Sequence, residues 1–292
     1  MSVDVTIKQK GMFKKALSMQ DFLGNTFKYG VLRANIIDFD KRDEEGFILY
    51  NPNAIARGIY VTYAEGNKST VSLSLSLFTS DREVDEFYDL IIHLCDIWKT
   101  NVFEQDGTQY RISDIKEQRI NIKNTCLSSL EEFLTKYQGY MIFGAYNPIS
   151  IDQEVADMLL EKKDLKVLGE YLHTLQKQDV YYARPSFYQG EKGIFGIYTL
   201  TEDCDSVFPI EPMIPFGMKD PQTGGKLEVN HWYLGVYSIS EEKILGQIDY
   251  FKFVEYVKLE EQSKYDARTN ILKGLDIKHL KDMLENCEQI VL

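Results

Sequence analysis

The residues most able to do chemistry lie together just after residue 200. The run Glu202-Asp203-Cys204-Asp205 places three carboxylates around one thiol. A reactive thiolate needs neighbouring positive charge, and carboxylates disfavour it, so a cysteine nucleophile is not expected here. Two carboxyl groups that face each other across a cleft can instead catalyse acid–base hydrolysis. Asp203 or Asp205 acting with His231 is therefore a hydrolase hypothesis, and a solvated polar turn before Val207 is the simpler interpretation.

A second group of side chains is suited to recognition. The chain holds 19 Tyr and 16 Phe, and many of the tyrosines lie in strand-like segments after residue 180. Tyr and Trp are enriched at interfaces, so His231-Trp232-Tyr233 is the predicted recognition patch. Arg184 is predicted to anchor a carboxylate or phosphate, with a structural salt bridge as the alternative. The candidate binding residues are Arg184, Asp203, Asp205, His231, Trp232 and Tyr233.

The sequence offers no pattern for a metal, a cofactor or a catalytic residue. The four histidines are not spaced as a pair of metal ligands, so we interpret them as surface or boundary residues. Gly190, Gly193 and Gly196 precede a strand-like segment rather than a helix, which favours a hairpin turn over a dinucleotide loop. Lys226 is followed by Leu227 instead of Ser or Thr, so the segment is not a P-loop. These observations favour a protein that is not an enzyme.

The charge balance constrains the partners. Lys and Arg number 33 against 45 Asp and Glu in 292 residues, which gives a net charge of −12. A phosphate backbone needs a basic surface, so we expect no nucleic acid, whereas a basic protein is the favoured partner. No apolar run approaches the roughly 20 residues that span a membrane. The N-terminus shows no secretory pattern and the four cysteines are scattered, which favours reduced thiols in the cytoplasm.

Hydrophobic periodicity predicts how these residues are positioned. Residues 58–64 and 69–78 alternate apolar and polar side chains, as expected of a half-buried hairpin. An amphipathic helix follows, and Ser80 with Glu83 predicts a capping box at its start. Strands and helices come in blocks rather than in βαβ alternation. The predicted fold is therefore α+β, with amphipathic helices packed on antiparallel sheets.

The same patterns predict two halves and further elements. A break at Asn147-Pro148 divides an N-terminal half, residues 1–147, from a Tyr-rich C-terminal half, residues 148–292. Residues 119–122 are predicted as a short strand, residues 244–259 as a long one, and Asp276 as the start of the last helix.

Several segments resemble a known family. Residues 57–59, 72–80 and 87–91, together with residues 5–8 and 17–24, are similar to a family of conserved bacterial proteins described only as a domain of unknown function. The resemblance implies a bacterial cytoplasmic protein. It implies no activity, cofactor or catalytic residue.

Three functional hypotheses follow. The favoured one is a non-enzymatic cytoplasmic binding protein that recognises a basic partner. The alternatives are a hydrolase with dispersed carboxylate and His residues, and a small-molecule sensor that uses the Tyr-rich strands. The oligomeric state is left open, because those strands are equally suited to a dimer interface.

Overall fold

The computed structural model describes residues 1–44, 46–136, 140–191, 193–221 and 223–290. The chain forms two compact units, Met1–Lys177 and Gln178–Leu292. The division falls after Lys177, whereas the sequence pattern placed it after Asn147. The difference arises because two helices that follow Asn147 pack into the core of the first unit. The predicted α+β class is confirmed, with helices beside mainly antiparallel sheets.

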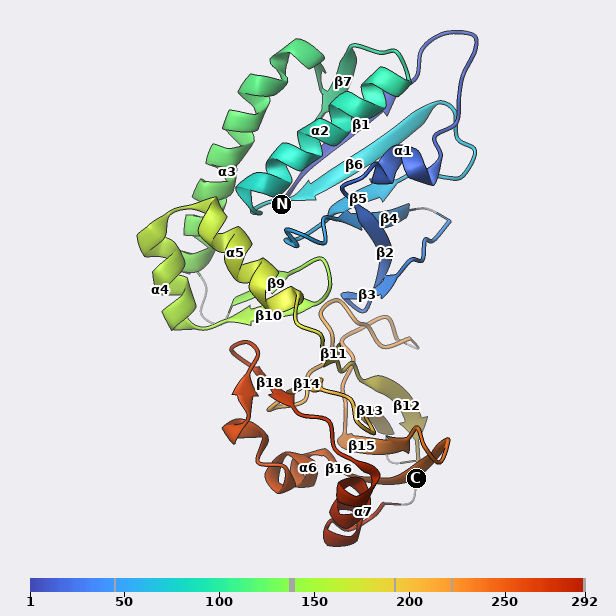
Figure 1. Cartoon of the computed structure of the whole chain (residues 1–292), viewed down its shortest axis with the longest axis vertical. Helices are drawn as coiled ribbons and strands as arrows, with labels where there is room; N and C mark the ends of the chain where they lie inside the picture. The colour runs from blue at the N-terminus through green and yellow to red at the C-terminus, as the bar shows by residue number, and fades with distance from the viewer. Residues whose placement is uncertain (45, 137–139, 192, 222, 291–292) are drawn as a thin grey trace. The chain divides into compact units, whose positions relative to one another are not determined.

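The first unit is built on an eight-stranded antiparallel sheet (Figure 1). Its strand order is β3-β2-β4-β5-β6-β1-β7-β8. The strands are β1 (Ser2–Lys8), β2 (Lys28–Arg33), β3 (Ile36–Phe39), β4 (Gly46–Tyr50), β5 (Ile59–Thr62), β6 (Thr70–Ser76), β7 (Val102–Gln105) and β8 (Thr108–Arg111), and a separate hairpin pairs β9 (Tyr140–Phe143) with β10 (Pro148–Ile151). The helices are α1 (Met19–Leu23), α2 (Asp81–Ile97), α3 (Ile115–Lys136), α4 (Gln153–Lys162) and α5 (Leu165–Gln176).

The hairpin and helix predicted around residues 58–97 are confirmed as β5, β6 and α2. Val71, Leu73 and Leu75 on β6 are buried, while the serines between them face the other side of the sheet. Helix α2 lies along β1 and β6 in Figure 1, and its apolar side chains share one core with these strands. Alternation in the strands and helical spacing in α2 thus direct apolar side chains to a common interior.

One predicted strand in this unit is wrong. Residues 119–122 lie inside α3, where Ile122 is buried and Arg119 reaches acidic side chains of α2. A short run of alternating apolar residues fits a helix face equally well, and packing against α2 decides the outcome. The helical spacing of apolar residues over 127–137, followed by a glycine, predicts a helix C-cap at Gly139, but residues 137–139 lie outside the described residues.

The described residues of the second unit form two four-stranded sheets and two α-helices. One sheet has the order β11-β14-β18-β17 and the other β12-β13-β15-β16. The pairs β11–β14 and β13–β15 are parallel, and the other pairs are antiparallel. The elements are β11 (Tyr181–Tyr182), β12 (Ser186–Gly190), β13 (Gly193–Thr201), β14 (Ser206–Pro209), β15 (His231–Ser238), β16 (Lys243–Asp249), α6 (Tyr250–Tyr256), β17 (Ser263–Lys264), β18 (Thr269–Leu272) and α7 (Ile277–Asn286).

The long strand predicted over residues 244–259 is wrong in its second part. The strand β16 ends at Asp249, and α6 begins at the next residue. The Asp249 side chain accepts hydrogen bonds from the N–H groups of Phe251 (2.9 Å) and Lys252 (3.2 Å), as an N-cap does. Tyr250 and Phe253 are then fully buried in the second core. Tertiary packing has overridden the strand preference of these aromatic residues.

Glu83 connects α2 to the irregular loop between β4 and β5, residues 51–58. The predicted N-cap is confirmed, since the Ser80 hydroxyl oxygen accepts a hydrogen bond from the Glu83 N–H at 3.1 Å. The reciprocal bond of a capping box is not formed, because the Glu83 side chain turns inward. Its carboxylate accepts hydrogen bonds from the N–H groups of Arg57 (3.1 Å) and Gly58 (2.6 Å) and from the Thr79 hydroxyl.

Arg57 completes this buried connection. Its guanidinium donates to the carbonyl oxygens of Leu77 (3.0 Å), Phe78 (2.9 Å) and Phe143 (3.0 Å). Gly58 has φ +79°, and a Cβ there would lie 2.5 Å from the Ile48 side chain. Only glycine can therefore present its N–H to Glu83 at this position.

We expect Glu83→Ala to lower the free energy of unfolding by about 3 kcal/mol or more. The substitution leaves two backbone N–H groups and a hydroxyl without an acceptor, close to the Arg57 charge. Chemical denaturation monitored by circular dichroism measures the loss. Asp96→Ala, at an exposed position near the end of α2, is the control, and it is expected to change stability by less than about 0.5 kcal/mol. Equal losses in the two variants would contradict the role of Glu83.

Candidate functional site

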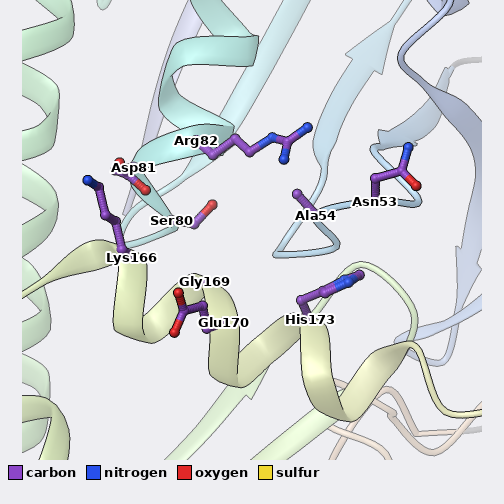
Figure 2. A pocket seen from close by; sticks show the side chains of 9 residues that line it. All are labelled: Asn53, Ala54, Ser80, Asp81, Arg82, Lys166, Gly169, Glu170 and His173. Carbon is purple, nitrogen blue, oxygen red and sulfur yellow. The ribbon is translucent and has the colours of Figure 1, made fainter.

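A pocket of about 350 Å³ lies in the first unit, above the loop that Glu83 holds (Figure 2). Three segments form its walls: the loop, the first turn of α2 and one face of α5. The lining residues are Asn53, Ala54, Ser80, Asp81, Arg82, Lys166, Gly169, Glu170 and His173.

The pocket floor is held by side chains of α5 and α2. The Ile55 N–H donates to Nδ1 of His173 at 3.1 Å. The carbonyl oxygen of Ala56 accepts a hydrogen bond from Nε2 of Gln176 at 2.8 Å. Asn51 donates to the Glu86 carboxylate at 2.5 Å. The first two bonds satisfy backbone groups of the loop, and the third joins the Asn51 side chain to α2, so the loop has a defined shape.

His173 is held in its neutral form. Because Nδ1 accepts a hydrogen bond, the ring proton resides on Nε2. Burial lowers the pKa of His173 below its usual value of 6.5, and the positive charges of Lys177 and Arg82 lower this pKa further. The ring is therefore a hydrogen-bond donor, not a cation, at neutral pH.

The pocket carries charges of both signs. Asp81, Lys166 and Glu170 lie toward one end in Figure 2, while the Arg82 guanidinium extends toward Asn53 at the other. The Nε of Arg82 contacts the Glu86 carboxylate at 2.9 Å, which fixes the guanidinium at the rim. Among the described residues, Lys166 and Glu170 form no ion pair with each other, although they are one turn apart on α5.

Helices α2 and α5 approach closely at this pocket. A Cβ at Gly169 would lie 2.7 Å from the Cβ of Ser80. A larger residue at position 169 would separate the helices, so glycine sets the width of the pocket. The walls are therefore formed before any ligand arrives.

The carboxylates predicted as a site serve local structure in the second unit. Asp205 accepts hydrogen bonds from the Lys273 ammonium (2.6 Å) and the Gly274 N–H (2.8 Å), and these donors lower the pKa of Asp205. Asp203 occupies a turn with φ +53°. Glu202 accepts hydrogen bonds from the N–H of Ser240 (3.0 Å) and the hydroxyl of Ser238 (2.8 Å).

The structure does not bring Asp203 or Asp205 together with His231. His231 pairs with Phe195 near the start of β13, whereas the two aspartates follow Thr201 at its end. Six residues of strand separate these points, which corresponds to about 20 Å. The geometry that the hydrolase hypothesis requires is therefore missing.

The predicted patch His231-Trp232-Tyr233 is divided between two faces of one sheet. Trp232 faces the core, where its ring contacts Phe187 and Tyr198. His231 and Tyr233 point to the opposite face, where their rings stack with a distance of 6.1 Å between the ring centroids. Successive side chains of a strand alternate, so three consecutive residues cannot share a face. Arg184 is half-buried between β11 and β12.

The face opposite the core carries a set of large side chains, which we name the aromatic face. It consists of Tyr188, Phe195, Ile197, Tyr233, Tyr237 and Ile244. A groove of about 460 Å³ runs over five of these residues, all but Tyr233. Gln247 also lines the groove, and its buried Oε1 has no hydrogen-bond donor in the described part of the chain.

Other chemical groups do not form a site within the described residues. No cluster of three metal-ligating side chains occurs among them. Burial raises the pKa of the Cys95 thiol to about 12 and that of Cys126 to about 11, so both stay protonated. None of the described helices is long and apolar enough to cross a membrane.

Comparison with known proteins identifies the family. A family model described as a domain of unknown function, DUF4299, matches residues 2–283. The chain belongs to this family. The resemblance inferred from the sequence is thereby confirmed for the family, which carries no assigned activity. Neither a curated protein nor a solved structure matches the chain.

The pocket in the first unit was not predicted from the sequence. Lys166, Glu170 and His173 recur at helical spacing on the side of α5 opposite its buried leucines. That spacing was a usable signal, because it places three polar side chains on one exposed stripe. The contribution of Asn53 and Arg82 could not be inferred, since their segments meet α5 only in the folded chain.

We expect the stability of the protein to fall as the pH drops below about 6.5, partly through His173. A pKa lowered on folding means that the unfolded chain binds the proton first, so acid favours unfolding. His173→Asn keeps an acceptor near the Nδ1 position but does not titrate. Denaturation midpoints between about pH 7.5 and pH 5 should therefore decline less steeply in this variant. His93→Asn, at an exposed position on α2, is the control. If it reduces the pH dependence of the denaturation midpoint as much as His173→Asn does, the role given to His173 is contradicted.

Substitution of Trp232 and of His231 should change the free energy of unfolding by very different amounts, although the two residues are neighbours in the sequence. Trp232→Ala is expected to lower the free energy of unfolding by about 3 kcal/mol, because it empties part of the second core. His231→Ala is expected to cost less than about 0.5 kcal/mol, since the side chain is exposed. Urea titration measures both values. A small loss for Trp232→Ala would mean that the tryptophan is not a packing residue.

Proposed function

We propose that this protein binds a basic protein partner through the aromatic face of its second unit. The observation that supports the proposal is the apolar groove beside exposed rings and aliphatic side chains. Tyr188 is 52% exposed and Ile244 is 64% exposed, and among the described residues neither belongs to the hydrophobic core of the second unit. Apolar side chains that gather on one surface mark interaction sites more often than scattered ones do.

The groove offers both anchors and a polar contact. Tyrosine rings supply large contact area at low cost in side-chain entropy, which is why they dominate binding energy at interfaces. No donor in the described part of the chain reaches the Oε1 atom of Gln247, and a buried acceptor without a donor costs about 1–3 kcal/mol. A partner N–H group, such as an ammonium or guanidinium, would remove this penalty.

Charge determines which partner is favoured. Residues 178–292 contain 19 Asp and Glu against 12 Lys and Arg. Glu191, Glu228 and Glu242 are exposed in the segments that flank β13, β15 and β16. Carboxylates around an apolar groove attract a basic surface and repel an acidic one, which increases the association rate.

We place this interaction in the cytoplasm of a bacterial cell. The four cysteines are free, and a reducing compartment keeps thiols in that state. The bacterial setting follows the resemblance of the sequence to a bacterial family.

A salt-dependent capture experiment tests the proposal. The full chain is immobilised and exposed to cell lysate at low salt, and the captured proteins are identified by mass spectrometry before and after a high-salt wash. We expect one basic protein that is released by salt, because screening weakens attraction between exposed charges. The double variant Tyr188→Ser/Ile244→Ser should weaken binding of the purified partner at least about tenfold.

Phe251→Ser is the matched control, since Phe251 is 55% exposed on α6 and lies outside the aromatic face. It should bind the partner as the wild type does. Capture that survives Tyr188→Ser/Ile244→Ser, capture that is lost equally in Phe251→Ser, or the absence of any salt-released basic protein would each overturn the proposal.

A further inference from the structure

The pocket of the first unit has the properties of a small-ligand site. Its volume of about 350 Å³ falls at the lower end of the range for ligand pockets, about 300–1,000 Å³. Its floor and walls are held by the bonds of His173, Gln176 and Ser80 described above. A preformed site loses little entropy on binding, which favours affinity for a small molecule.

The lining determines the chemical class of the ligand. Arg82 and Lys166 disfavour a polyamine, while Asp81 and Glu170 disfavour a polyphosphate or another multiply charged anion. Among the described lining residues, Ala54 and Gly169 are the apolar types, and apolar atoms of the polar and charged side chains make up much of the remaining surface. A small molecule with one negative and one positive group satisfies all of these conditions.

The two ends of the pocket favour one orientation. Toward the loop, the Arg82 guanidinium, the Nε2–H of His173 and the Asn53 amide are groups that donate to a carboxylate. At the other end, Asp81 and Glu170 supply the carboxylates that can accept hydrogen bonds from an ammonium, and Lys166 stands one turn from Glu170 on α5. We propose that this pocket binds a small zwitterion of the amino-acid class, with its carboxylate at the Arg82 end and its ammonium at the Glu170 end.

Isothermal titration calorimetry on the full chain tests this site, with each of the standard free amino acids as probe. We expect heat of binding from at least one. For that amino acid, the N-acetyl derivative and the carboxamide should each bind at least about tenfold more weakly, because each lacks one of the two charges. Failure of every free amino acid to bind would overturn the proposal. Equal affinity of the N-acetyl derivative would also overturn it, since the site would then recognise only an anion.

Two variants locate the binding in this pocket. Arg82→Gln and Glu170→Gln should each weaken binding at least about tenfold. The controls are Arg33→Gln and Glu154→Gln, because the Arg33 side chain is 54% exposed, close to the 56% of Arg82, and Glu154 is exposed on α4. Glu170 is exposed, and within the described residues its side chain forms no hydrogen bond with the loop, so Glu170→Gln tests the site without perturbing the fold. Unchanged binding in Glu170→Gln, or equal loss in the controls, would contradict the assignment.

This site is independent of the proposed partner interface, which lies in the other unit. Tyr188→Ser/Ile244→Ser should leave amino-acid binding unchanged, and Glu170→Gln should leave partner capture unchanged. The two proposals can therefore fail separately.

Discussion

The buried carboxylate of Glu83 is the interaction on which the first unit depends. Residues 51–58 leave the sheet between β4 and β5, so their backbone groups have no strand partner. Glu83 accepts two of the N–H groups, and His173 and Gln176 bind two further backbone groups. Burial of this carboxyl group raises the pKa of Glu83, and the hydrogen bonds from the Thr79 hydroxyl and from the N–H groups of Gly58 and Arg57 oppose that rise. The loop, α2 and α5 are thereby joined at one point, and the pocket forms where they meet.

The local patterns of this chain predict its regular elements well and its long-range contacts poorly. The alternation in β6 and the apolar stripe of α2 fix which sides are buried, since both depend only on backbone geometry. The direction of the Glu83 side chain depends on Arg57 and Gly58, more than twenty residues earlier, so a capping-box pattern could not distinguish the two outcomes. Helix α6 was missed because its aromatic residues favour a strand, although Asp249 carried an N-cap signal.

The candidate site shows the same division. The hypothesis that joined His231, Trp232 and Tyr233 treated neighbours in the sequence as neighbours on a surface. Side chains alternate between the two faces of a strand, so the sequence alone could have predicted that Trp232 faces away from His231 and Tyr233. The pocket could not be predicted from the sequence, because Asn53, Arg82 and His173 come from three segments that are far apart in the chain. Asp203 and Asp205 were predicted as site residues because carboxylates can catalyse reactions. In the structure, Asp203 lies in a turn and Asp205 accepts a hydrogen bond from the Gly274 N–H.

The two units differ in the kind of binding that their surfaces support. The first unit offers a small pocket with charges of both signs, where specificity would come from hydrogen bonds to a few atoms. The second offers an extended apolar groove in an acidic environment, where binding energy would come from buried rings. Each unit has its own hydrophobic core. Stability and binding are less separable within the first unit, because Arg82 contacts Glu86, which also accepts a hydrogen bond from Asn51 of the loop. Glu170 lies outside this network, which makes it the residue that most directly distinguishes ligand recognition from folding.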